Sequence, residues 1–256
     1  MSVTIAVTSG KGGTGKTMFS VNLAALLAMN ESRVLIIDLN TGLRNVDICL
    51  GMENQVIYDL SDVVNGLCPV DRAMIRDDRF DCLYLISASQ DVSKAEIGYS
   101  DIVKLLGQVA PDFDFIVIDT PPGMGSDWKA AVKSSDLTVV MLTQELASVR
   151  DADSVDYMLE KLGVKKRCAV INRLRRENYG KGESCFPSLN EIFSMLHMQV
   201  AGGIIEDSNI HLSMNSGVPV VCMKEGYVLG NFKRIFMRML SVLHGDEESV
   251  QQPSGK

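Results

Sequence analysis

The sequence predicts an α/β protein with a doubly wound, mostly parallel sheet that carries helices on both faces. Short apolar runs recur along the chain and are continuous rather than alternating, which is typical of parallel strands covered on both sides. Helical apolar patterns lie between these runs, and a glycine-rich loop joins the first run to the first helical pattern. Folds of this class bind ligands at the carboxyl ends of their strands.

The predicted strands end in acidic or polar residues. The first, at residues 3–7, is short and rich in β-branched side chains, as buried strands are. Asp38, Asp119 and Asn172 close three of the others. The expected strands cover residues 3–7, 33–38, 82–86, 115–119, 137–142, 167–172 and 200–205.

Helical periodicity is clearest at residues 148–162, where the apolar side chains fall on one face. Ser148 and Asp151 predict a capping box at the start of this helix. Further helices are expected at residues 18–28, 101–109, 189–196 and 231–243.

The loop after the first strand fits the pattern G-x-x-x-x-G-K-[ST] in its required context, after a strand and opening a helix. Its glycines let backbone N–H groups surround a phosphate, because a Cβ would collide with the anion or forbid the dihedrals. Lys16 can reach the β- and γ-phosphates, and the Thr17 hydroxyl can ligate Mg²⁺. The residues expected to bind the nucleotide here are Gly10, Lys11, Gly12, Gly13, Thr14, Gly15, Lys16, Thr17 and Met18.

Asp119 ends the strand at residues 115–119 and precedes a Pro-Pro-Gly turn at residues 121–123. A carboxylate at the carboxyl end of a buried strand, beside such a loop, is placed to hold Mg²⁺, usually through a water. The turn after it is placed to sense the γ-phosphate. The alternative is a strand-end aspartate that only caps a turn, and the neighbouring loop favours the metal role.

The composition argues against several other classes of protein. The net charge is −7 and the sequence pI is about 5.0, unlike proteins that coat nucleic acid by bulk electrostatics. No run of about 18 apolar residues occurs and no signal peptide is evident, so a cytoplasmic protein is expected. The six cysteines form no C-x-x-C pair, and the three histidines are scattered and suggest no metal site.

One domain is the natural interpretation of 256 residues. It is expected to span residues 1–244. Residues 245–256 are short, polar and rich in Ser, Gln and Glu, and are expected to form a disordered tail.

A second lysine separates this loop from an ordinary phosphate-binding loop. Lys11 directly follows Gly10, and one set of phosphates does not need both Lys11 and Lys16 from one loop. The pattern resembles the deviant Walker A motif of the MinD/ParA family of signature-lysine ATPases. In that family the first lysine reaches across a dimer to the partner's nucleotide. The resemblance therefore implies ATP as ligand and an ATP-dependent homodimer.

The resemblance covers about residues 3 to 243 and is closest to the MinD branch of the family. Residues 38–47 resemble its first switch, which implies a metal and catalytic role for Asp38 beside those of Lys11 and Lys16. Asn40 stands where the family usually carries a second acid. An amide can orient water but cannot take its proton, so hydrolysis is expected to be slow without a partner. The segments that carry the rest of the likeness are residues 45–52, 84–90, 147–153 and 215–220.

Asn172 and Asp207 match family positions that contact the adenine. An asparagine side chain offers both a donor and an acceptor, as the purine edge requires. The family often has a proline where Ile205 stands, which weakens the match at Asp207. Without the resemblance, Asn172 fits equally well as a turn residue at the end of a strand.

Two surfaces leave alternatives open. Residues 231–243 are amphipathic with three basic side chains, and MinD proteins end in a basic helix that binds membrane. The order of elements favours a core helix here over a membrane anchor.

A basic cluster could touch DNA, as in ParA proteins, but a solvated face or partner site is favoured on an acidic protein. The cluster comprises Lys165, Lys166, Arg167, Arg173, Arg175, Arg176 and Lys181.

The resemblance implies an ATP-dependent dimerising switch that recruits a regulatory partner protein, as in selection of the division site. The ATP-bound form could then sit on the inner face of the membrane. Two alternatives are an FlhG-like regulator of flagellar number and a scaffold that binds ATP but hydrolyses little.

Overall fold

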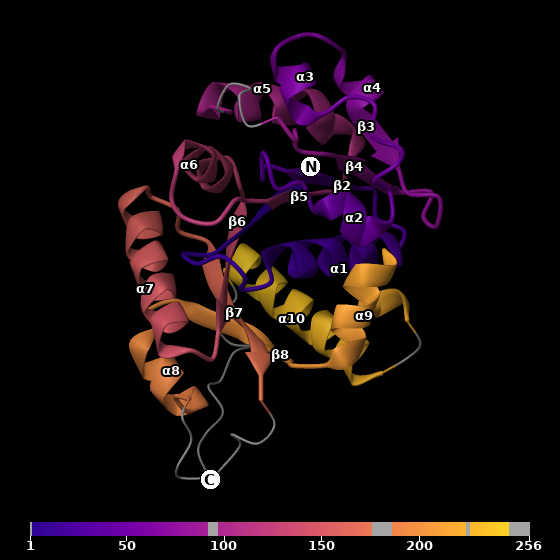
Figure 1. The fold of residues 1–256 in the computed structure, drawn as a ribbon. Coiled ribbons are helices and arrows are strands. Elements are labelled where there is room, and N and C mark those ends of the chain that lie inside the picture. The colour runs from indigo at the N-terminus through magenta and orange to yellow at the C-terminus, as the bar shows by residue number, and fades with distance from the viewer. Residues whose placement is uncertain (1, 92–96, 176–185, 224–225, 246–256) are drawn as a thin grey trace.

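The computed structural model describes residues 2–91, 97–175, 186–223 and 226–245, whose strands form one eight-stranded sheet (Figure 1). The strands are β1 (Val3–Thr8), β2 (Val34–Asp38), β3 (Met74–Arg76), β4 (Leu83–Ile86), β5 (Phe115–Asp119), β6 (Leu137–Thr143), β7 (Arg167–Leu174) and β8 (Gln199–Ile205). The helices are α1 (Lys16–Ala28), α2 (Val46–Leu50), α3 (Leu60–Val64), α4 (Val70–Ala73), α5 (Tyr99–Val109), η1 (Ala110–Asp112), α6 (Ser126–Lys133), α7 (Leu146–Lys161), α8 (Leu189–Met195), α9 (Ser208–Ser216), η3 (Val220–Cys222) and α10 (Tyr227–His244).

The strands are arranged in the order β3-β4-β2-β5-β1-β6-β7-β8. Every described pairing is parallel except that of β3 with β4. The central strand β1 therefore places the loop that follows it between the ends of β5 and β6. The antiparallel edge strand β3 was not predicted, because it has only three residues, none of them buried, and so carries no readable period.

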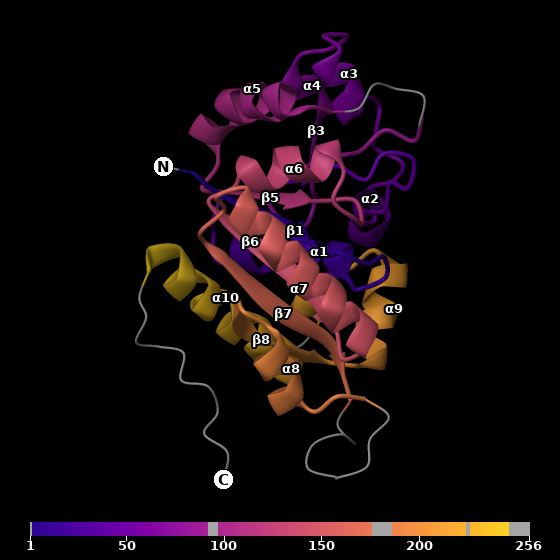
Figure 2. The same cartoon turned by 90° about the vertical axis from the view of Figure 1, so that its left-hand side faces the viewer.

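Helices cover both faces of the sheet, which confirms the predicted fold class (Figures 1 and 2). One core layer contains side chains of α1, α2, α9 and α10, and the opposite layer contains side chains of α5, α6, α7 and α8. Phe19 of α1 stacks on Phe232 of α10 with ring centroids 5.7 Å apart. Trp128 of α6 is fully buried in the other layer and donates from Nε1 to the Thr8 hydroxyl.

Helix α7 begins two residues earlier than predicted, and its expected capping box is wrong. Ser148 lies inside the first turn, where its Oγ accepts the N–H of Thr143 at 2.9 Å. The hydroxyl thus stabilises the strand-to-helix connection, and Glu145 occupies the N-cap position without a side-chain cap. A capping box does occur at α8, between Ser188 and Glu191, one residue before the predicted helix.

The last helix is a core helix, as expected. Phe232 and Ile235 are almost fully buried, and Phe236 packs edge-on against Phe115 at a centroid distance of 6.0 Å. The apolar stripe that a membrane would require is therefore already covered by the sheet. Among the residues described, no helix combines the length and hydrophobicity needed to cross a bilayer. Apart from Gly245, the predicted tail at residues 245–256 lies outside the described residues.

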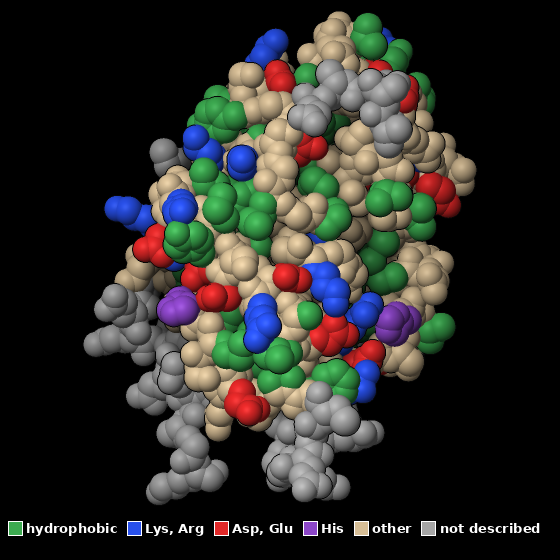
Figure 3. All heavy atoms as spheres, turned by 60° about the vertical axis from the view of Figure 1, so that its left-hand side comes forward, with side chains coloured by type: hydrophobic (Ala, Val, Ile, Leu, Met, Phe, Trp, Pro, Cys, Tyr) green, Lys and Arg blue, Asp and Glu red, His purple; other side chains and the backbone are tan. Residues whose placement is uncertain are grey.

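The predicted basic cluster is not one surface. Arg167 begins β7 and Arg173 lies near its end, and six strand residues span roughly 20 Å. Arg167 pairs with Asp156, and Arg175 pairs with Glu206 at 3.7 Å. On the face of the molecule that Figure 3 presents, blue and red side chains are interspersed. Arg176 and Lys181 lie outside the described residues.

Candidate functional site

The glycine-rich loop crosses the carboxyl edge of the sheet between β1 and α1. Gly15 has a φ of +96°, and a Cβ there would lie 2.2 Å from Nδ2 of Asn172. A Cβ on Gly10 would lie 2.8 Å from the carbonyl oxygen of Asp151 on α7. Both positions therefore require glycine because of backbone geometry and close packing. The loop is held against β7 and α7 as well as being shaped to surround an anion.

Lys16 lies inside the loop with 8% of its surface exposed. Its Nζ donates to Oγ of Ser9 at 2.9 Å, and that hydroxyl donates to the carbonyl of Lys11 at 2.6 Å. Burial lowers the pKa of Lys16, and the charge of Asp119 partly opposes this shift. A buried ammonium at the first turn of a helix is a strong site for phosphate.

Two buried carboxylates face the loop from adjacent strand ends. Asp38 of β2 and Asp119 of β5 are register partners. Asp119 accepts hydrogen bonds from Thr17 Oγ1 at 2.6 Å and from Ser20 Oγ at 2.9 Å. The Asp38 carboxylate instead accepts backbone N–H groups, at 2.8 Å from Asn40 and 3.4 Å from residues 45 and 46.

Burial destabilises the charged form of both carboxylates, and Asp119 adds to the effect at Asp38. Burial, with a contribution from Asp119, raises the pKa of Asp38 to about 7. Burial raises the pKa of Asp119 to about 6, although hydrogen bonds from Thr17 and Ser20 and the charge of Lys16 oppose the shift. Carboxylates whose pKa values are raised in this way are stabilised in their charged forms when a divalent cation binds to them.

These shifts predict that the metal-free protein loses stability as pH rises. Each folded-state pKa lies above its value of about 3.9 in an unfolded chain, so the native state binds more protons between pH 4 and 7. We expect the unfolding free energy in EDTA to fall by about 2 kcal/mol more in wild type than in Asp38→Asn between about pH 5 and 7.5. Urea titrations at several pH values measure the unfolding free energy of both proteins. An equal pH dependence in the two would contradict a raised pKa of Asp38 in the folded state.

A cavity of about 140 Å³ lies on the other side of the loop. Asn172 reaches it from the end of β7, where the pairing with β8 is irregular, and its Nδ2 donates to the carbonyl of Thr14 at 2.9 Å. Asp207 caps α9 by accepting the N–H of Asn209, and it also accepts the Tyr227 hydroxyl. The residues that line the cavity are Gly15, Met18, Asn172, Arg173, Glu206, Asp207, Ile210, His211 and Met214.

Unlike Lys16, the Lys11 side chain lies outside the interior of the phosphate loop. Its Nζ makes an ion pair with Oε2 of Glu145 at 2.8 Å, and the two side chains are 45% and 53% exposed. The sequence suggested no partner for Lys11 within its own subunit, and the structure supplies one. Exposed ion pairs typically contribute less than about 1 kcal/mol, so this contact leaves Lys11 free to move.

Comparison with known proteins connects this site to a family. A family described as "AAA domain" matches residues 2–167. The septum site-determining protein MinD of Bacillus subtilis is 35% identical over 242 residues, which cover 94% of this chain and 90% of that protein. The chain belongs to the MinD family. The family predicted from the sequence is therefore confirmed.

Solved structures agree with this assignment. The MinC:MinD cell division protein complex of Aquifex aeolicus contains a chain that superposes with a TM-score of 0.85 at 28% identity, covering 98% of this chain and 99% of that one. MinD of Pyrococcus horikoshii, solved with Mg-ADP, shares the fold with a TM-score of 0.80 at 24% identity, covering 96% and 97% of the chains.

In this MinD family member, Asn40 is half-buried beside Asp38. Its Nδ2 donates to the carbonyl of Leu43 at 3.3 Å, while its N–H donates to Asp38. The amide therefore holds the segment after β2 in a turn. Where the family usually carries a second acid, this chain has an amide that is hydrogen-bonded to the same loop.

Several residues of the site had not been predicted. Ser20 could have been found, because it lies three positions after Thr17 on the same helix face and so reaches the same carboxylate. Ile210 and Met214 of α9 line the cavity one helical turn apart, but only the tertiary fold brings α9 to the loop. Glu145 has no sequence signal, because its contact with Lys11 spans 134 positions.

Proposed function

We propose that this chain is an ATP-dependent dimerising switch of the MinD type that positions a partner protein during division-site selection. One observation carries the proposal: a two-lysine phosphate loop, two buried carboxylates and a cavity beside the loop meet at one edge of the sheet. Membership of the MinD family supports the cellular role. The partner would be a regulatory protein, as the MinC:MinD complex illustrates for a relative.

The site offers groups that would bind the phosphates of ATP and a cavity that would bind its adenine. Loop N–H groups and the ammonium of Lys16 would bind the phosphates, because they combine positive charge with a helix N-terminus. The cavity would take the adenine, with Asn172 and Asp207 at its polar rim and Met18 on its apolar side. The presence of both polar residues in the lining of one cavity supports the adenine roles that the family resemblance implied for them.

The carboxylates fit Mg²⁺ by their chemistry. Thr17, Asp38 and Asp119 offer hard oxygen ligands, and burial raises the pKa of both acids, so a bound cation would stabilise their charged forms. These three side chains would hold Mg²⁺, which would supply positive charge to the phosphates when bound. Within the described ranges no group of three or more His, Cys, Asp or Glu side chains could hold a metal ion.

Asn40 supports a second candidate, a scaffold that binds ATP and hydrolyses it little. Its side-chain amide is bonded to Leu43 and has no basicity to take a proton from water. We infer slow turnover without a partner in either case. Hydrolysis that continues when the partner is added separates the switch from the scaffold. A membrane surface is not part of the proposal, because the apolar stripe of α10 is buried.

The proposed function predicts a nucleotide-dependent change of mass. ATP with Mg²⁺ should convert the full-length protein from monomer to dimer, while ADP should leave it monomeric. Multi-angle light scattering measures this directly. Lys16→Ala serves as the control, because it removes the charge inside the loop and should lose nucleotide affinity by calorimetry. A monomer at saturating ATP, or the same dimer with ADP, would contradict the switch.

A further inference from the structure

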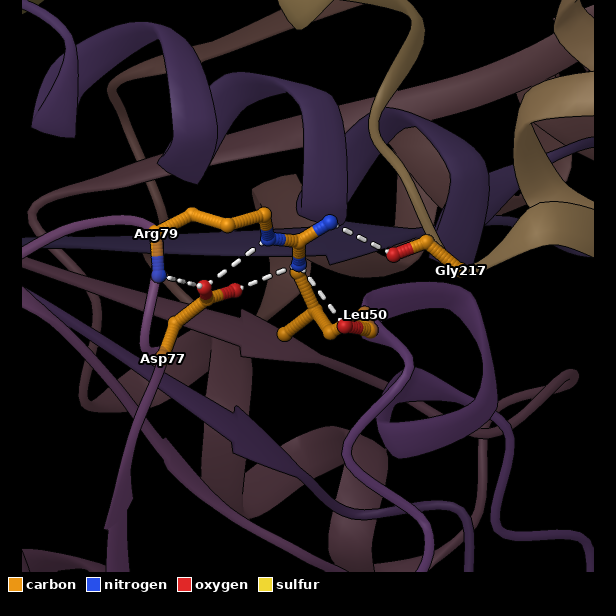
Figure 4. A network of polar contacts seen from close by, with 4 residues as sticks. All are labelled: Leu50, Asp77, Arg79 and Gly217. Carbon is orange, nitrogen blue, oxygen red and sulfur yellow. Dashed lines mark hydrogen bonds and ion pairs between the residues drawn. The ribbon is translucent and has the colours of Figure 1, made fainter.

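The ends of two helices meet Arg79, which lies in the turn between β3 and β4 (Figure 4). Its Nη1 donates to the carbonyl of Gly217 at 2.6 Å, and its Nη2 donates to the carbonyl of Leu50 at 2.7 Å. Its Nε donates to Oδ1 of Asp77 at 2.9 Å. Asp77 is 2% exposed, so the guanidinium is held in place by a buried carboxylate while it binds two carbonyls.

Both carbonyls belong to helix C-termini. Leu50 is the last residue of α2, and Gly217 is the C-cap of α9. Such carbonyls lack partners within the helix and carry partial negative charge, which a rigid guanidinium fork neutralises. The helix ends also touch directly, because a Cβ on Gly217 would lie 2.6 Å from the Cα of Gly51. Arg79 therefore clamps two helix ends that already abut.

The opposite ends of these two helices reach the site. Helix α2 is five residues long, roughly 7 Å, and the N–H of its first residue, Val46, donates to the Asp38 carboxylate. Helix α9 begins after Asp207 and lines the cavity along its first two turns. Arg79 thus connects the helix at the metal-side carboxylate to the helix at the proposed adenine cavity.

We propose that Arg79 is a positioning residue that couples occupation of the adenine cavity to the placement of Asp38. The inference rests on the proposed function, because it assumes an adenine nucleotide in the cavity and Mg²⁺ at Asp38. A base in the cavity orders α9, and the guanidinium transmits that order through α2 to the N–H groups that hold Asp38. The protein should therefore bind Mg²⁺ more tightly when ADP is bound than when pyrophosphate is bound. This ratio of Mg²⁺ affinities should exceed the ratio that the two anions show in solution without the protein.

Calorimetry of Mg²⁺ binding tests the coupling, with the protein saturated by ADP or by pyrophosphate. The solution affinities of the two anions are common to all variants, so a change in the ADP-to-pyrophosphate ratio comes from the protein. Couplings of 5- to 150-fold are typical, and we expect Arg79→Ala to lower the ratio about 10-fold. Arg76→Ala is the matched control, because Arg76 lies in β3 and makes an exposed ion pair with Asp81 at 3.6 Å. Its ratio should equal that of wild type.

A ratio unchanged in Arg79→Ala would overturn the proposal and leave Arg79 as a brace of the fold, even if urea titration showed a less stable protein. Should Arg79→Ala not fold, Arg79→Lys decides, because it keeps the charge but cannot span both carbonyls. A wild-type ratio in Arg79→Lys would likewise overturn the coupling, and a lowered one would support it. Wild type that binds no Mg-ADP would instead overturn the proposed function, which separates the two failures.

Discussion

Lys11→Ala is expected to bind ATP with Mg²⁺ and remain monomeric at concentrations where wild type is fully dimeric. Lys11 lies outside the loop interior, where Lys16 already supplies the ammonium for the phosphates. Removing it should therefore leave nucleotide affinity within about 3-fold of wild type, because one exposed ion pair contributes little. The dimer should weaken at least about 100-fold, since a charged contact to the partner's phosphates is lost where water is excluded.

The pair with Glu145 provides a control for this prediction. If Lys11 acted only through that contact, Glu145→Ala would reproduce the monomeric behaviour of Lys11→Ala. We expect Glu145→Ala to dimerise with ATP, because it removes the partner within the subunit and leaves the lysine. Light scattering and ATP calorimetry on the two variants compare mass and affinity. A normal ATP dimer in Lys11→Ala would rule out a role for this lysine across the interface.

The features that the sequence predicted well are local in the chain or repeat along it. The phosphate loop is a contiguous motif, and the continuous apolar strands follow from burial on both faces. Asp38 and Asp119 could be expected near the loop because parallel strands bring their carboxyl ends to one edge. The adenine roles of Asn172 and Asp207 followed only from the family resemblance, because the residues that line the cavity beside them come from α1, β7 and α9.

What remained hidden depends on contacts between distant segments. Arg79 donates to carbonyls that lie 29 and 138 positions away in the sequence, and it follows β3, a strand too short to give a sequence signal. Ser148 illustrates a competing local choice, because the same hydroxyl suits a helix cap or the connection to Thr143. The basic residues near β7 seemed to cluster because they are close in sequence, yet an extended strand separates them.

Asn40→Asp is expected to raise the rate of ATP hydrolysis by about 10²-fold, the lower end of what general-base assistance typically supplies. An aspartate cannot donate to the Leu43 carbonyl, so the side chain would leave the turn that now holds it. The released carboxylate would lie beside Asp38 and could orient and deprotonate the attacking water. The new carboxylate adds negative charge next to two buried acids whose pKa values are already raised. The rate should therefore be measured at saturating Mg²⁺, which compensates this charge.

Single-turnover hydrolysis by wild type, Asn40→Asp and Asn40→Ala, at saturating Mg-ATP and matched dimer fraction, decides this prediction. Asn40→Ala also frees the turn at Leu43 but brings no base, so it should be no faster than wild type. If both variants are faster, release of the turn sets the rate and the carboxylate does not. If Asn40→Asp is no faster than wild type, Asn40 is not the brake. Control would then lie with Asp38 or with a partner protein that completes the site, because catalysis of phosphoryl transfer is mostly positioning and electrostatics.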